Sequence, residues 1–258
     1  MTFLDQIIER KKEEVERLKD EVGSDPYHPL HGEIKRNNLK RFQNALRRKG
    51  VIAEIKRKSP SKGDINPSLD PIKLAKEYEE GGAIALSVLT DEVGFGGTMK
   101  DLIEVKKGVR IPVLQKDFII DPLQIKEAIY AGADGVLLIV AVLKDQTGEF
   151  LRIAEELGID ALVEVHTEKE LKLAIEVGAK IIGINNRDLK TFGVDLSHSL
   201  NFLKLLPKEC IKVAESGIKS IDDARVLFDG GFDALLIGET LVRAENPKKM
   251  IGEMNDAR

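Results

Sequence analysis

The sequence contains a single cysteine, Cys210, and no tryptophan. One cysteine cannot form an internal disulfide, which suits a reducing compartment, and we expect the protein in the cytoplasm. No apolar run approaches the roughly 18 residues of a membrane-spanning helix, since the longest candidate, Val136–Val142, has the length of a strand. Residues 1–20 are interrupted by acidic and basic side chains, unlike a signal peptide. We therefore expect no membrane partner.

An excess of positive charge is also missing. The chain has 40 Lys and Arg against 44 Asp and Glu, a formal net charge of −4 and a pI near 5.8. Nucleic-acid-binding proteins present a clustered basic face, so we expect no nucleic-acid partner. The four histidines show no metal-ligand spacing, and we expect no metal: His28, His31, His166 and His198. His166 follows the fifth expected strand and is predicted to neighbour the site rather than to act in it.

What the sequence does have is a repeated alternation of short aliphatic runs and helical patterns. The run starts lie about 26 residues apart on average, which is typical of βα units. The predicted strands are Val51–Lys56, Ala83–Leu89, Pro112–Phe118, Asp134–Val140, Asp160–Val165, Lys180–Asn185, Ile211–Ser216 and Asp233–Gly238. The helices between and after them are predicted at Asp70–Glu80, Met99–Lys107, Pro122–Ala131, Lys144–Leu157, Glu168–Val177, Leu196–Leu205, Ser220–Phe228 and Pro247–Met254.

Eight such units predict an α/β fold, a (β/α)8 barrel, in one domain over residues 1–258. A glycine precedes several of the predicted strands by a few residues, as in Ala131-Gly132-Ala133-Asp134. A glycine in this position typically ends the preceding helix and begins the short turn into the strand. Residues 1–48 precede the barrel (49–258) as a helical extension, with an apolar stripe that predicts a helix packed on the barrel. An open doubly wound sheet is the structural alternative, but the dinucleotide fingerprint expected after its first strand is missing.

Charged residues occur at strand positions that alternation turns into the barrel. In Val51–Lys56, Glu54 and Lys56 share the face of Ile52, and the apolar set on the other face suits the helix side. Lys116 and Glu164 take inward positions in the third and fifth strands in the same way. These four charged residues could form two Lys–Glu pairs that only fill the interior of the barrel. Because active sites of such barrels lie at the carboxyl ends of the strands, where these residues converge, a catalytic role is favoured over this structural one.

Two glycine-containing loops predict a phosphate site. Barrels often bind phosphate in the loops after strands 7 and 8, and these loops contain Ser216-Gly217 and Gly238-Glu239. The loop after the first strand, which includes Ser59, is basic and could serve as a lid over an anionic substrate. Phe95 stands among glycines after the second strand, as a binding platform or as part of a local cluster.

Several segments resemble the indole-3-glycerol phosphate synthase family. They cover nearly the whole chain in family order: Ile52–Ser61, Leu114–Phe118, Leu162–His166, Gly183–Leu189 and Val213–Ile218. The resemblance implies a carboxy-lyase of tryptophan biosynthesis that needs no cofactor or metal. It would close the indole ring of 1-(2-carboxyphenylamino)-1-deoxyribulose 5-phosphate with loss of CO2 and water.

The resemblance also implies roles for individual residues. Lys116 would be the general acid, Glu164 the base, and Lys56 a carboxylate-binding group or second acid oriented by Glu54; the division between the two lysines stays open. Asn185 and Ser216 are also expected in the catalytic set. The expected binding residues are Asn185 and Glu215 at the sugar hydroxyls, Ser59 and Arg187 on the carboxylate and lid side, Phe95, Phe118 and Leu138 around the aromatic ring, and Ser216, Gly217, Gly238 and Glu239 at the phosphate.

Two other hypotheses remain for comparison. Phosphoribosylanthranilate isomerase is a related phosphate-binding barrel, but it pairs a Cys with an Asp, whereas the first strand here offers Glu54 and Lys56. A non-catalytic metabolite-binding barrel would not need Lys56, Lys116 and Glu164 together. As partner we expect a small phosphorylated substrate, and as assembly a monomer, with a weak homodimer as the alternative.

Overall fold

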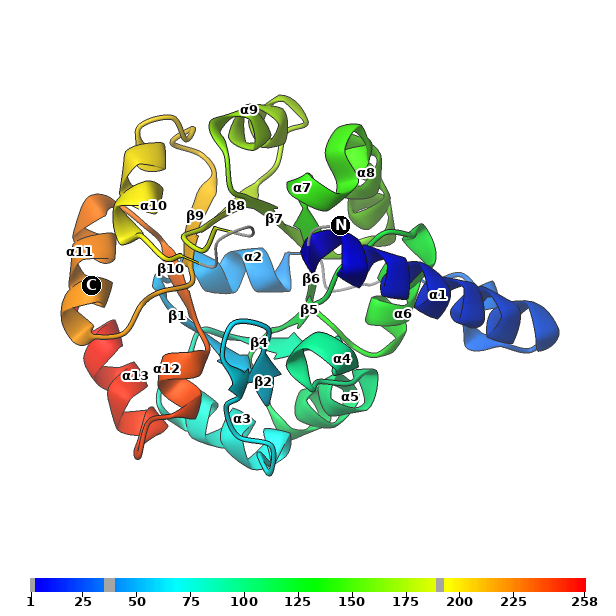
Figure 1. The fold of residues 1–258 in the computed structure, drawn as a ribbon, viewed down its shortest axis with the longest axis horizontal. Helices are drawn as coiled ribbons and strands as arrows, with labels where there is room; N and C mark the ends of the chain where they lie inside the picture. The colour runs from blue at the N-terminus through cyan, green and yellow to red at the C-terminus, as the bar shows by residue number, and fades with distance from the viewer. Residues whose placement is uncertain (1–2, 35–39, 189–192) are drawn as a thin grey trace.

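The computed structural model describes residues 3–34, 40–188 and 193–258. Eight parallel strands form a closed barrel in the order β1-β10-β9-β8-β7-β6-β5-β4 (Figure 1). Their bounds are β1 Gly50–Ile55, β4 Ala85–Leu89, β5 Val113–Lys116, β6 Gly135–Ile139, β7 Asp160–Val165, β8 Ile181–Asn185, β9 Ile211–Glu215 and β10 Ala234–Ile237. The prediction of a (β/α)8 barrel is confirmed.

Helices surround the barrel, and most begin at a side chain that caps them. The long outer helices are α3 Pro71–Glu80, α5 Met99–Gly108, α6 Pro122–Tyr130, α8 Thr147–Leu157, α9 Glu168–Glu176, α10 Leu196–Leu203, α11 Ile221–Gly230 and α13 Pro247–Asn255. Thr98, Asp121 and Ser220 form capping boxes that satisfy free amides of the first turn. At the C-terminal end of α11, Gly231 has φ 113°. Residues with a side chain adopt such a positive φ only with steric strain, whereas glycine does not.

The strands separate two apolar cores. Ile52, Leu114 and Leu162 point into the barrel, whereas their neighbours Val51 and Val163 pack outward against the helices. All six residues of β1 are buried, as expected for a parallel sheet covered on both faces. The outer of these cores packs the helices against the strands, and the inner one fills the interior of the barrel.

The N-terminal segment packs against both ends of the barrel. Helix α2 (Arg41–Leu46) places the fully buried Phe42 and Leu46 against the inner core, and Figure 1 shows it across the far end. Helix α1 (Phe3–Ser24) crosses the near side and extends beyond the barrel (Figure 1). The predicted helical extension is therefore present. Among the described helices, none has the length and apolar character needed to cross a bilayer.

Several short elements were not predicted. They are the 3-10 turns η1 Pro29–His31 and η2 Lys144–Gln146, the hairpin of β2 Lys58–Ser59 and β3 Gly63–Asp64, and the single turns α4 Glu92–Phe95, α7 Val140–Leu143 and α12 Glu239–Val242. Val140 begins a helix, so the predicted strand Asp134–Val140 was too long. The predicted helix over Lys144–Leu157 is divided between η2 and α8. All of them except η1 follow the end of a barrel strand, and each has too few residues to show a periodicity.

Candidate active site

A cavity of about 580 Å³ opens at the carboxyl ends of the strands. Its walls come from strand ends, from the following loops and from Leu4 and Ile7 of α1. Both charge signs line it: Lys56, Lys62, Lys116, Arg187, Lys219 and Arg243 as cations, and Glu54, Asp117, Glu164, Glu215 and Glu239 as carboxylates. Such a cavity, rich in convergent charged groups, suits a small anionic ligand.

Lys116 is the centre of the charged cluster. Its Nζ lies 3.1 Å from Oε2 of Glu164 and 3.3 Å from Oε2 of Glu215. The three groups come from β5, β7 and β9, and both carboxylates are almost completely buried. Glu215 fills the space above Gly183, where an added Cβ would stand 2.1 Å from its Oε1. A residue with a side chain at position 183 would therefore displace this carboxylate.

Burial and ion pairing set the protonation of this cluster. Burial opposes charge on Lys116, but Glu164 and Glu215 raise its pKa above the usual value. Burial also opposes charge on Glu164, yet Lys116 and His166 hold its pKa below the usual value. For Glu215, burial and the neighbouring Glu164 together raise the pKa to about 8. At neutral pH the cluster thus holds an ammonium, a carboxylate and a carboxyl that keeps its proton.

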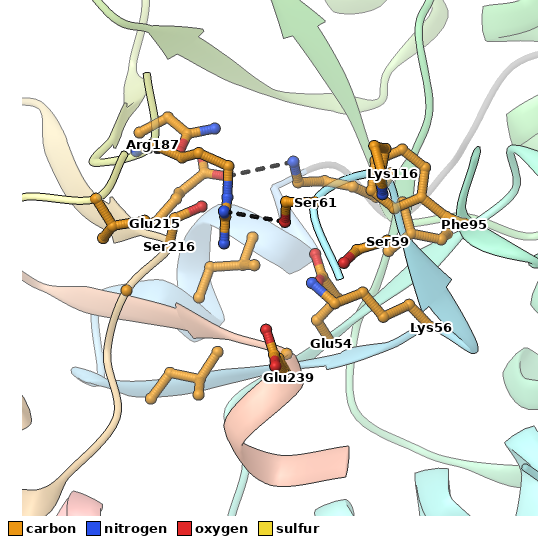
Figure 2. A pocket seen from close by; sticks show the side chains of 18 of the residues that line it. Glu54, Lys56, Ser59, Ser61, Phe95, Lys116, Arg187, Glu215, Ser216 and Glu239 are labelled. Atoms are coloured by element: carbon orange, nitrogen blue, oxygen red, sulfur yellow. Dashed lines mark hydrogen bonds and ion pairs between the residues drawn. The ribbon is translucent and has the colours of Figure 1, made fainter. Parts of the chain in front are cut away.

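The second lysine has a carboxylate of its own. Nζ of Lys56 lies 2.6 Å from Oε1 of Glu54, and Figure 2 shows both groups at the same side of the cavity. Gly238 allows this pair to form, because a Cβ there would stand 2.2 Å from Oε1 of Glu54 and 2.9 Å from Nζ of Lys56. Besides the phosphate contact expected of it, the glycine therefore leaves room for the Glu54–Lys56 pair.

The loop after β1 is a hairpin held at its base and tip. Arg57 makes two hydrogen bonds to Asp101, of 2.7 and 2.9 Å, and one to the carbonyl oxygen of Gly96. At the tip, Nη1 of Arg187 donates to Oγ of Ser61 at 3.1 Å, which joins the hairpin to the loop after β8 (Figure 2). Ser59 is buried and lines the cavity as expected. The hairpin therefore roofs part of the cavity.

The apolar side chains that line the cavity differ in one residue from the predicted set of Phe95, Phe118 and Leu138. Phe95 and Phe118 line the cavity with ring centroids 6.4 Å apart. Leu138, expected beside them, points outward into the core between barrel and helices, so that prediction is wrong. Leu137 and Ile139 face the cavity instead. An unbroken apolar run such as that of β6 carries no alternation from which the inward phase can be deduced.

The loops after β9 and β10 form the side of the cavity expected to bind phosphate. Ser216, Gly217, Gly238 and Glu239 all line it, with Asn185 and Glu215 beside them. Ser216 has φ 68°, a left-handed conformation that non-glycine residues rarely adopt, and Gly217 follows with φ 83°. Strained backbone of this kind is concentrated at functional sites.

Some residues that line the cavity were not predicted as site residues. They are mainly loop and helix residues: Leu4, Ile7, Ser61, Lys62, Lys219, Thr240 and Arg243. Thr240 donates to the carbonyl oxygen of Ile218 at 2.6 Å and so joins the two loops of the expected phosphate side. For the loop residues the only available signal was proximity to a strand end, which many surface residues share. Leu4 and Ile7 belong to α1, and their apolar character predicted packing on the barrel rather than contact with the cavity. Among the described residues, no group of three or more metal-ligating side chains is arranged around a point.

A parallel barrel with ion-paired lysines and glutamates in its mouth defines a (β/α)8-barrel enzyme with an acid–base site. The profile of the family "Indole-3-glycerol phosphate synthase" matches residues 4–254. The chain belongs to the indole-3-glycerol phosphate synthase family.

Individual relatives agree with this assignment. The indole-3-glycerol phosphate synthase of Exiguobacterium sibiricum is 48% identical over 100% of this chain and 98% of the relative. That of Lachnoclostridium phytofermentans is 51% identical over 81% of this chain and 79% of the relative. Among solved structures, a thiamine phosphate pyrophosphorylase from Pyrococcus furiosus covers 83% of this chain and 96% of its own with a TM-score of 0.62. At 19% identity that likeness concerns the fold alone.

Proposed function

We propose that this protein is an indole-3-glycerol phosphate synthase, a carboxy-lyase of tryptophan biosynthesis. Its substrate is 1-(2-carboxyphenylamino)-1-deoxyribulose 5-phosphate, and the reaction is ring closure with loss of CO2 and water. The observation that carries the proposal is the position of Lys116 between Glu164 and Glu215 on the cavity wall. At neutral pH this arrangement supplies an ammonium acid beside a carboxylate base, which the reaction needs.

Ring closure requires that the ring carbon bearing the carboxylate attack the ketone carbon. The ketone oxygen then gains charge, and Lys116 stabilises it and gives it a proton. After CO2 has left, Glu164 removes a proton from the methylene carbon beside the nitrogen while the hydroxyl leaves as water. Lys56, oriented by Glu54, binds the carboxylate and supplies the second proton to the leaving hydroxyl.

The remaining residues bind the substrate. The phosphate lies at Ser216, Gly217, Gly238 and Glu239, the last through its backbone N–H; Asn185 and Glu215 hold the sugar hydroxyls. Arg187 and Ser59 support the carboxylate side under the hairpin. Phe95 and Phe118 pack on the aromatic ring, with Leu137 and Ile139 in the place first assigned to Leu138.

The cavity composition supports an anionic substrate, because six lysine and arginine side chains line it. Compartment and assembly are part of the proposal: a cytoplasmic, single-domain monomer. The buried thiol of Cys210, whose pKa burial raises to about 11, supports a structural rather than a reactive cysteine. Sedimentation of the purified protein would test the assembly, and a dimer would contradict it.

The experiment that tests the reaction is an assay of the purified protein with this substrate. Indole fluorescence and released CO2 should rise together in a ratio of one to one. Fluorescence without CO2, or no product with substrate in excess, would overturn the proposed function.

A further inference from the structure

The proposed reaction consumes a proton in each turnover. One proton goes to the ketone oxygen and one to the hydroxyl that leaves as water, whereas only one returns from the methylene carbon. The carboxylate leaves as neutral CO2, and its bonding pair restores the aromatic ring. The net uptake is therefore one proton per CO2 released, and it has to reach Lys116 and Lys56, whose side chains are only 13% and 15% exposed.

His166 lies where such a proton could enter. Its Nε2 is 3.5 Å from Oε1 of Glu164, and its Nδ1 is 3.6 Å from Oε2 of Glu170, on α9. The side chain is nine-tenths buried, at 10% exposure, and neither ring nitrogen makes a hydrogen bond in the described part of the chain. The backbone N–H of His166 donates to the same Oε2 of Glu170 at 2.7 Å, which fixes this carboxylate beside the ring.

A second cavity begins on the other side of His166. It is lined by His166, Glu170 and His198 among others, and it shares Leu4, Asn185, Arg187 and Val194 with the main cavity. Glu164 lines only the main cavity, and Glu170 lines only the second. The imidazole thus stands between a carboxylate on the reaction side and a carboxylate on the other side.

We propose that His166 carries the required proton from the second cavity to Glu164 and so recharges the site after each turnover. After the reaction Glu164 holds the proton from the methylene carbon and passes it to the neutral amine of Lys116, 3.1 Å away. The imidazolium then gives its Nε2 proton to the ionised Glu164, and a proton moves on through Lys116 to the neutral amine of Lys56, which lines the same cavity, so that both lysines are charged and Glu164 is ionised again. The imidazole that remains turns toward the second cavity and takes up the next proton from water. Because His166 acts through Glu164 and touches no substrate atom, it is a positioning residue.

The charges around His166 favour the protonated ring. Burial opposes its charge, but Glu170 and Glu164 together raise its pKa above the usual value. The charged and titratable groups that face it or line the second cavity are Glu164 from β7, Glu170 from α9, Glu215 from β9, Lys116 from β5, Arg187, Asp188 and Asp195 from the loop after β8, and His198 from α10. An imidazolium next to an ionised Glu164 is the state from which the transfer starts.

The inference rests on the proposed reaction, and a burst experiment on the full-length His166→Gln variant tests it separately. The first turnover uses protons already on Lys116 and Lys56, so indole fluorescence should show a first turnover at the wild-type rate. Later turnovers should be about ten- to a hundredfold slower, because recharging then limits them. Added imidazole should restore part of the steady-state rate of the variant. In the wild type the steady-state rate should fall at alkaline pH as His166 loses its proton, and this fall should be missing from the pH profile of the variant.

Glu170→Gln is the second variant, since it keeps the size of the side chain and removes only the outer carboxylate. It should lower the steady-state rate and move the alkaline limb to lower pH. His198→Gln is the matched control: His198 lines the same second cavity, but its ring packs on Phe202 at 4.5 Å, and its loss should leave the rate unchanged.

Two results would overturn the relay. One is a His166→Gln enzyme with the wild-type steady-state rate and pH profile. The other is a first turnover slowed as much as the later ones, without rescue by imidazole, which would make His166 a structural residue. If the wild-type protein forms no indole product, the proposed function itself fails, and the two failures are thereby distinguished.

Discussion

At the scale of the residue, the protein concentrates charge where it is least solvated. Lys116, Glu164 and Glu215 are held within ion-pair distance inside the barrel, although isolated charges of this kind are costly to bury. Their mutual contacts set one acid in its charged form, one base in its charged form and one carboxyl in its neutral form. These are the protonation states that acid–base chemistry requires before a substrate arrives.

Removing the ammonium should abolish most of the turnover. We expect Lys116→Met to lower kcat by about 100- to 10,000-fold, because the ketone oxygen then loses its proton donor. Indole fluorescence under saturating substrate measures this. Lys100→Met, on an exposed helix face with 81% of the lysine side chain in water, is the control and should keep full activity. Activity of Lys116→Met equal to that of the control would remove Lys116 from the mechanism.

Neutralising Glu215 should stabilise the fold as pH rises. Its folded pKa of about 8 exceeds the ordinary value of 4.5, so its contribution to stability is present below pH 4.5 and is lost toward pH 8. Gln imitates the protonated carboxyl. Relative to the wild type, Glu215→Gln should therefore gain about 1 to 3 kcal/mol in unfolding free energy between pH 5 and pH 8. Urea denaturation at both pH values measures this gain; a gain independent of pH would contradict the raised pKa.

The residues that point into the barrel could be predicted wherever charged and apolar residues distinguish the two faces of a strand. Glu54 and Lys56 in Val51–Lys56, and Glu164 in Asp160–Val165, interrupt the apolar pattern on one face of the strand, and this interruption indicates the direction of the side chains. Leu138 could not be placed, because its strand is apolar on both faces. Gly238 was identified, but the side chains that need its missing Cβ come from β1, and such a long-range contact leaves no mark in the local sequence.

At the scale of the element, helix α1 is fastened over the barrel mouth by one buried lysine. Lys11 is only 2% exposed, and its Nζ lies 2.8 Å from Asp117, 3.3 Å from Asp91 and 2.6 Å from Glu14. Asp117 also accepts a 2.5 Å hydrogen bond from Thr90 and follows Lys116 directly in sequence. The lysine thus joins α1 to the ends of β4 and β5.

Loss of this lysine should weaken both the fold and the site. We expect Lys11→Met to lower the unfolding free energy by about 3 to 5 kcal/mol, because the carboxylates of Asp91 and Asp117 would remain buried without their cation. The same variant should raise KM, since Leu4 and Ile7 of α1 line the cavity. Chemical denaturation and steady-state kinetics measure the two effects.

Lys12→Met is the matched control on the same helix. Lys12 is 58% exposed and pairs only with Glu9 among the described residues, so its loss should change stability by less than about 0.5 kcal/mol. Equal effects of the two substitutions would contradict the buried network. The apolar stripe of α1 predicted its packing on the barrel, but a charged residue in the sequence indicates an exposed position, and Lys11 was missed for that reason.

At the scale of the whole molecule, the closed barrel brings together residues that are far apart in the chain. Lys116, Glu164 and Glu215 come from three strands and Lys56 follows the end of a fourth, and only closure of β1 against β10 and β4 places them around one cavity. The fold was predictable because eight similar units repeat along the chain. The hairpin after β1 and its contact with Arg187 were not, because they depend on two loops meeting across the mouth.

The most direct measurement is a crystal structure of this protein with a non-reacting analogue in which the substrate ketone is reduced to an alcohol. We predict the phosphate at the loops after β9 and β10, the aromatic ring beside Phe95 and Phe118, and the alcohol oxygen within about 3.5 Å of Nζ of Lys116. An analogue bound with its phosphate at the opposite wall, or with this oxygen out of reach of both Lys116 and Lys56, would contradict it.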